Sequence, residues 1–166
     1  MKKFSRYMLM AAVALFSWAC QPDDLNDLET PNYELRKEGV VGAWKVNAVK
    51  LVDVPLAAID DPLAEQDVTD VFDASQLEFT FKADNTFTIK KKEGSNAPNF
   101  FGVESGTWSF YEEEGGFVTK MKLTEGDKSV DLVFESAPRP GHSLSVSFVR
   151  NAGGEDILKY VYDLNL

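Results

Sequence analysis

The chain has 166 residues, a formal net charge of −10, one cysteine and one histidine. Such an acidic surface repels phosphate backbones, so the composition argues against a nucleic-acid partner. A single cysteine excludes a disulfide within the chain, and one cysteine with one histidine cannot form a Cys/His metal cluster. We therefore expect no metal and no cofactor.

The first 19 residues have the composition of an export signal. Met1–Arg6 is basic, and residues 7–19 are apolar but too few to span a bilayer about 30 Å thick. Ala19 stands directly before Cys20, the only cysteine of the chain. A small residue before a cysteine at this place resembles the lipobox of bacterial lipoproteins. The resemblance implies cleavage before Cys20 and its diacylation, with a palmitate-type anchor; an ordinary secretory signal is the alternative.

Residues 20–38 are polar and acidic, which predicts a flexible tether between the anchor and the folded domain. Gln21 is not the aspartate that marks inner-membrane retention, so we expect attachment to the outer membrane. Asp23 and Asp24 resemble the surface-export signal of some Gram-negative lipoproteins, and a plain solvated linker is the alternative. Exposure on the cell surface and orientation toward the periplasm both stay open.

Residues 39–51 predict the first strand of a domain that extends over 39–166. A glycine at position 42 lets the backbone approach closely, while a large ring two residues later closes the end of a core. Strict alternation would place one set of side chains on a single face: Trp44, Val46, Ala48 and Lys50.

Residues 53–76 are irregular, because Pro55 and Pro62 interrupt a segment crowded with acids. A short helical turn over 62–66 is expected within it. The acids favour a solvated loop. A calcium site is the alternative and rests on charge alone, because the spacing does not fit an EF-hand.

Residues 77–92 predict a β-hairpin with one apolar face. Leu77, Phe79 and Phe81 alternate with polar residues, and Phe87 and Ile89 resume the alternation after an Asp-Asn turn. A lone hairpin is unstable in water, so further strands must cover this face.

Further alternating segments follow at 105–111, 117–123, 130–134, 143–148 and 158–164, separated by glycine-rich or charged turns. Together with the earlier segments they make eight strands with short connections and no long helix. The sequence therefore predicts an all-β fold, an eight-stranded antiparallel up-and-down barrel, with a β-sandwich as the alternative.

Three short motifs in this order resemble those of lipocalin-like (calycin-like) lipoproteins of Gram-negative envelopes, a group often described only as a domain of unknown function. They are Gly42-Ala43-Trp44, Ala83-Asp84-Asn85-Thr86-Phe87 and Gly106-Thr107-Trp108. The resemblance implies a lipocalin-like barrel whose first-strand tryptophan plugs the base.

Aromatic side chains at alternating positions are the candidates for a ligand site. They either line a cavity or fill a small barrel. Phe100 and Phe101 are adjacent, so both cannot face the same side of a strand, and one is expected either to be exposed or to cap the barrel mouth. The candidates for binding a small hydrophobic molecule or a glycan are Trp44, Phe79, Phe81, Phe87, Phe100, Phe101, Trp108 and Tyr160.

The sequence favours a non-enzymatic protein. His142 follows a Pro-Arg-Pro-Gly turn, and Ser143 points to the other side, so a Ser-His pair is not expected. The leading hypothesis is a lipid-anchored envelope protein that binds a small ligand at the barrel mouth. The alternative is a structural or interaction protein with a packed core that docks on an envelope complex, such as a nutrient-uptake assembly.

Overall fold

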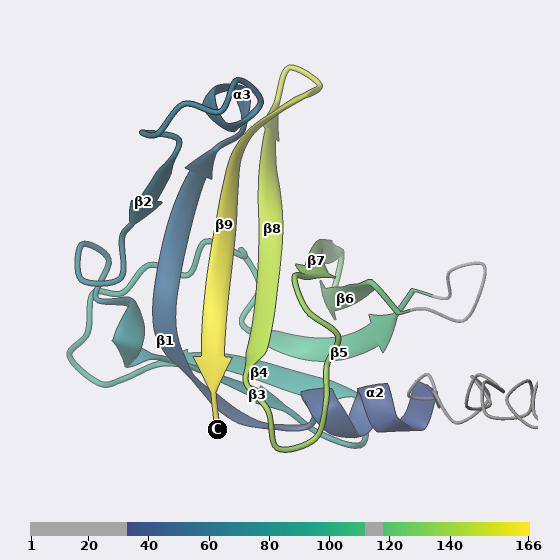
Figure 1. Cartoon of the computed structure of the whole chain (residues 1–166). Helices are drawn as coiled ribbons and strands as arrows, with labels where there is room; N and C mark the ends of the chain where they lie inside the picture. Colours follow the sequence, from purple (N-terminus) through teal and green to yellow (C-terminus); the bar gives the residue numbers. More distant parts are fainter. Residues whose placement is uncertain (1–32, 112–117) are drawn as a thin grey trace, which may run out of the picture. The chain divides into compact units, whose positions relative to one another are not determined.

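The computed structural model describes residues 33–111 and 118–166, and in these ranges nearly all regular structure is β-strand (Figure 1). Three short helices are α2 (Tyr33–Val40), α3 (Val54–Ala57) and the 3-10 helix η2 (Ala74–Gln76). The strands are β1 (Gly42–Asp53), β2 (Glu65–Asp67), β3 (Leu77–Phe81), β4 (Thr86–Lys91), β5 (Ser105–Phe110), β6 (Lys120–Glu125), β7 (Lys128–Phe134), β8 (Leu144–Ala152) and β9 (Glu155–Asn165).

Eight of these strands form a closed antiparallel barrel. The order is β1-β3-β4-β5-β6-β7-β8-β9, and β9 pairs back onto β1 from Lys45↔Asn165 to Asp53↔Leu158. The ninth strand, β2, adds to β1 beyond the part that pairs with β3. The predicted up-and-down barrel is confirmed. Closure leaves neither β1 nor β9 as an exposed edge, which a sandwich of the same strands would not achieve.

The predicted hairpin is formed by β3 and β4. Phe79 lies opposite Ile89 and Phe81 opposite Phe87, and all four side chains face the core. Asn85 adopts a positive φ of 65° in the turn, as the Asp-Asn sequence predicts. Hydrogen bonds from the side chain and the backbone N–H of Thr86 to the Asp84 carboxylate close the turn and lower the pKa of that carboxyl group.

The predicted single alternation through β1 is wrong. Trp44 and Val46 are buried, but a bulge between Val46 and Ala48 then shifts the register against β9. An extra residue in one strand resets which side chains face inward, so Val49 is buried in place of Ala48. Lys50 points outward and forms an ion pair with Glu65 of β2, with 2.7 Å between Nζ and Oε1.

The helical turn expected over 62–66 is also wrong. The helix in this segment is α3, which begins earlier because Asp53 accepts a hydrogen bond from the Leu56 N–H (2.9 Å) and Pro55 suits its first turn. Glu65–Asp67 instead forms β2, since β1 offers free backbone groups at Lys50–Val52.

Helix α2 takes up residues 33–40, so its first six residues lie in the range predicted as tether. It lies beside the end of the barrel at which β1 begins (Figure 1). The Trp44 indole N–H donates to the carbonyl of Val40 (2.8 Å), which joins the end of the helix to the tryptophan of the first strand. Within residues 33–111 and 118–166, no helix has the length and apolar character that a membrane span requires.

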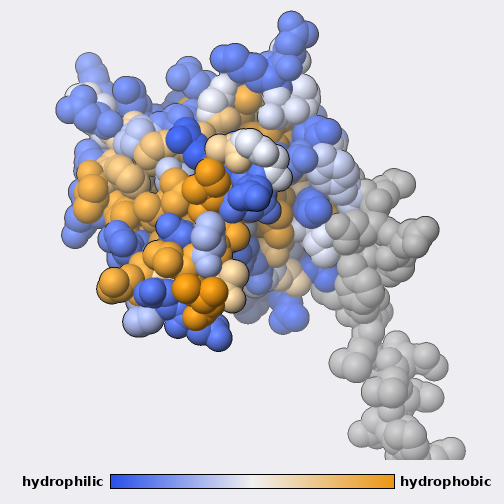
Figure 2. All heavy atoms as spheres, turned by 90° about the horizontal axis from the view of Figure 1, so that it is seen from above, coloured by the Kyte–Doolittle hydropathy of each residue, from blue (hydrophilic) through white to orange (hydrophobic). Residues whose placement is uncertain are grey.

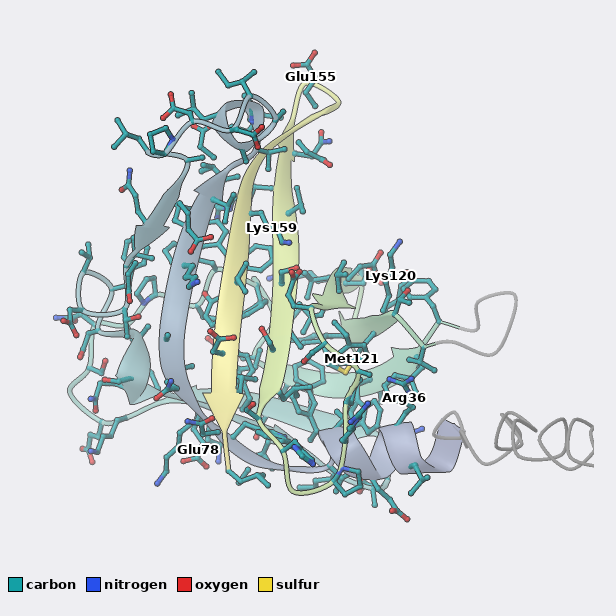
Figure 3. The ribbon with its side chains drawn as sticks, viewed as in Figure 1. Arg36, Glu78, Lys120, Met121, Glu155 and Lys159 are labelled. Carbon is teal, nitrogen blue, oxygen red and sulfur yellow. The ribbon has the colours of Figure 1, made fainter. Side chains whose placement is uncertain are left out.

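One continuous core fills the barrel. Met121, on β6, lies among the side chains inside, and Glu155 marks the tip of the turn between β8 and β9 (Figure 3). The strands β1, β8 and β9 extend beyond β3–β7 at the end where α3 lies (Figure 1). We call that end the mouth.

Candidate functional site

The residues predicted to bind a ligand lie mostly inside the barrel. Seven are between 0 and 6% exposed and belong to the single core cluster: Trp44, Phe79, Phe81, Phe87, Phe101, Trp108 and Tyr160. Several of their rings pack edge-to-face, as for Phe81 against Trp108, with 6.1 Å between ring centroids. Of the two roles left open by the sequence, filling the barrel is the one these side chains perform in the structure.

Phe101 reaches the core because of the loop that carries it. The side chain of Asn99 donates to the carbonyl of Val103 (2.7 Å) and accepts from the N–H of Phe101 (3.0 Å), which folds residues 99–103 into a tight turn. The ring of Phe101 then lies 4.8 Å from that of Phe148 and 4.9 Å from that of Tyr162. Burial raises the pKa of the Tyr162 phenol, so this group stays neutral beneath the loop.

Phe100, the adjacent residue, is only partly buried and packs against the same core. Its ring stacks on Tyr160 with 4.8 Å between centroids and meets Phe72 edge-to-face at 4.9 Å. The guanidinium of Arg150 lies over both rings, 5.6 Å from the centroid of Phe100 and 5.9 Å from that of Tyr160. We call Phe72, Phe100, Arg150 and Tyr160 the mouth cluster. Phe100 is thus the more exposed of the two adjacent phenylalanines, and its role as a cap of the mouth stays a prediction.

The mouth cluster connects the core with the surface. Tyr160 stacks on Phe148 with 5.0 Å between centroids and a 7° interplanar angle, and Phe148 in turn contacts Phe101. Arg150 is exposed and forms no ion pair within 4 Å with any residue that the structure describes. The cluster therefore offers a partly exposed apolar ring beside an unneutralised cation. The rings beneath it belong to the core and cannot move without disturbing that core.

Two members of the cluster were missed by sequence reasoning. Arg150 could have been found, because it lies two residues after Phe148 on the same face of β8 and opposite Leu158 of β9. Phe72 lies in an irregular turn between β2 and η2, where no periodicity indicates the direction of a side chain.

A polar network lies on the outside of the barrel near β7–β9. The Glu135 carboxylate accepts from the hydroxyl of the buried Ser147 and from Lys159 Nζ, the latter at 2.9 Å. Partial burial raises the pKa of Glu135, but the hydrogen bonds from Lys159 and Ser147 outweigh it, so the pKa lies below its ordinary value. A carboxylate held ionised in this way joins three strands and is a poor general base.

His142 lies in an exposed turn, where its backbone N–H donates to the carbonyl of Arg139. Together with Ser136, Ala137, Arg139 and Ser143 it lines a shallow hollow of about 230 Å³. In residues 33–111 and 118–166, no three His, Cys, Asp or Glu side chains are grouped so that they could hold a metal ion. Cys20 lies outside the described residues.

No curated protein matches the sequence. A family model described as Domain of unknown function (DUF5004) matches residues 23–165, a range that contains the whole barrel. The predicted resemblance to a group of unknown function agrees with this match, while the family's description does not mention lipocalins. The chain belongs to the DUF5004 family.

Proposed function

We propose that this chain is a lipid-anchored protein of the cell envelope whose lipocalin-like barrel is a non-enzymatic binding module. The ligand is a small hydrophobic molecule held at the mouth of the barrel, above a packed core. The mouth cluster carries this proposal, because it combines a partly exposed aromatic surface with a cation that has no acidic partner among the described residues.

The arrangement of the cluster suggests how such a ligand is held. A flat or branched apolar group can stack on Phe100 and against Phe72, which are already oriented by the rings beneath them. An acidic group on the ligand would lie near Arg150, whose planar guanidinium suits a carboxylate. Because the base is rigid, little conformational entropy is lost on binding.

Native mass spectrometry of the protein purified gently from envelopes tests this function. We expect a discrete added mass that is lost in Phe100→Ala and reduced in Arg150→Gln. Val149→Ala is the matched control, because Val149 is exposed on the opposite face of the same strand and should leave the added mass unchanged. A bare protein mass, or an added mass that survives Phe100→Ala, would refute binding at the mouth.

The anchor has its own test, which depends on the unique cysteine. After growth with an alkyne fatty acid, we expect label on the wild-type protein in the outer-membrane fraction and no label on Cys20→Ser. Absence of label on the wild-type protein, together with its release in soluble form, would contradict the lipoprotein assignment. Protease treatment of intact cells distinguishes surface exposure from periplasmic orientation.

An interaction protein that docks on an envelope complex is the second candidate. Ile59, Leu63 and Val71 are 71–75% exposed on the acidic segment between β1 and β3, and hydrophobic residues are visible on the mouth end of the domain (Figure 2). A contact surface would require these exposed aliphatic side chains to form one contiguous patch. Crosslinking in whole cells from a residue placed at position 63 would favour this candidate if a single envelope protein were captured while the mouth variants had no effect.

A further inference from the structure

Lysines line two hollows at the Leu77/Lys91 end of β3 and β4, one of which reaches Lys45 of β1. The hollows, of about 560 and 510 Å³, adjoin at Leu77, Lys90 and Lys91, and the two are taken together as one depression. We call it the lysine groove. Its basic residues are Lys45, Lys90, Lys91 and Lys92.

The strand register brings these lysines together. Lys45 of β1 lies opposite Glu78 of β3, which lies opposite Lys90 of β4, so a row of charges crosses three strands. Lys91 pairs with Leu77 at the end of β4, and the N–H of Lys92 donates to the carbonyl of Gln76 (2.9 Å). The position of each lysine along the groove is therefore set by backbone hydrogen bonds.

The far wall of the groove is a loop held by its own hydrogen bonds. The Ser95 hydroxyl donates to the Asp73 carboxylate (3.0 Å) and accepts from the N–H of Ala97 (3.0 Å). Ala97 is buried, which fixes the loop against the barrel and leaves Asn96 exposed at the rim. These contacts hold the loop, and with it this wall of the hollow, in one position.

The charge of the groove is opposite to that of the protein. Its four lysines are exposed, and among the described residues none of them forms an ion pair within 4 Å. Only two acids, Glu78 and Glu104, line the same depression. An excess of unpaired cations in a concave site of a protein with a net charge of −10 concentrates positive potential there.

We propose that the lysine groove binds an acidic oligosaccharide, a chain of sugars that carries carboxylate or phosphate groups. Lysines spaced along an extended depression fit repeated negative charges, and the neutral donors Ser75, Gln76 and Asn96 beside them fit hydroxyl groups. This site lies on the side of the barrel, uses none of the mouth-cluster residues and stands independently of the function proposed above.

Two other anionic partners fit the groove less well. A bilayer surface is flat, whereas the groove is bounded by the loop at residues 96–99. An extended acidic peptide gains most of its affinity by adding a strand to a free sheet edge. β3 is paired on both sides, and β4 is paired on both sides over Thr86–Thr88, so a peptide could add a strand only at the short end of β4 beside the loop.

Fluorescence anisotropy with a labelled short oligogalacturonate tests the assignment on the purified protein. We expect saturable binding that weakens with added salt and falls at least about tenfold in the double variant Lys90→Gln/Lys91→Gln, which loses two charge-assisted contacts. The control is Lys120→Gln/Lys128→Gln, which removes the same charge from β6 and β7 and should change the affinity less than about twofold. A urea titration of each variant verifies that it is folded.

Comparison probes decide the class of ligand. A neutral maltooligosaccharide of equal length should not bind, and a polyglutamate peptide and phosphatidylglycerol vesicles should bind at least about tenfold more weakly than the acidic sugar. Equal affinity for polyglutamate or for vesicles would overturn the proposal, since it would indicate a non-specific basic patch. Absence of oligogalacturonate binding, or equal loss in the control variant, would overturn it as well.

Discussion

Gly106→Ala is the substitution whose effect the structure defines most sharply. A methyl carbon at position 106 would lie 1.9 Å from the carbonyl oxygen of Thr124 and 2.9 Å from its carbonyl carbon, whereas real Cβ atoms essentially never approach closer than 3.0 Å. The obstacle is backbone, so β5 and β6 must separate by about 1 Å or more. Such overpacking costs about 1–3 kcal/mol, and each ladder hydrogen bond that breaks adds about 1 kcal/mol. We expect the free energy of unfolding to fall by about 3 kcal/mol or more.

Gly42→Ala is the matched control, because Gly42 also stands two residues before a tryptophan. Its Cβ would meet side chains rather than backbone: the Cδ2 atom of Leu166 at 2.6 Å, whose exposed terminal side chain can turn away, and Nε1 of Trp44 at 3.3 Å. We expect a change of less than about 1 kcal/mol. Urea denaturation followed by far-UV circular dichroism measures both variants. Equal losses of stability would refute the view that position 106 requires glycine because the backbone of β6 lies so close.

Three further outcomes follow from the packing. Wild type should be more stable than Glu135→Gln, and the full difference should be present at pH values above about 4.5, the ordinary pKa of this group. The difference should disappear as the pH falls through the lowered pKa of Glu135 in the folded protein. In urea titrations, a difference that stays constant down to about pH 3 would contradict the hydrogen bond from Lys159. Phe101→Ala should lower the free energy of unfolding by about 3 kcal/mol and Phe100→Ala by about 1 kcal/mol. Equal losses would contradict the view that Phe101 fills the core while Phe100 lies at the mouth. Arg36→Met should leave the free energy of unfolding unchanged or raise it by about 1 kcal/mol. Arg36 is only 7% exposed, and its Nε atom has no hydrogen-bond partner in the described residues. A loss above about 2 kcal/mol would show that the guanidinium is paired.

Local patterns in the sequence predict the eight barrel strands and the fold class, but not β2. Alternation at Leu77–Phe81 and Thr86–Lys91, with an Asp-Asn turn between them, specifies a half-buried hairpin, and the structure shows it. Short turns between successive strands leave few topologies other than an up-and-down meander. These features are local, because the period of a strand and the chemistry of a turn depend on neighbours along the chain.

Which side chains lie together depends on contacts between distant parts of the chain. The bulge at Val46/Ala48 follows from the pairing of β1 with β9, which are separated by most of the domain, and it alone determines that Val49 faces inward. The mouth cluster joins a turn before β3, a loop after β4 and two residues of the last hairpin. The lysine groove needs the register of three strands and the folding back of the loop at residues 95–99. Closure of the barrel sets all of these contacts, and closure depends on pairings between distant residues that no local pattern encodes.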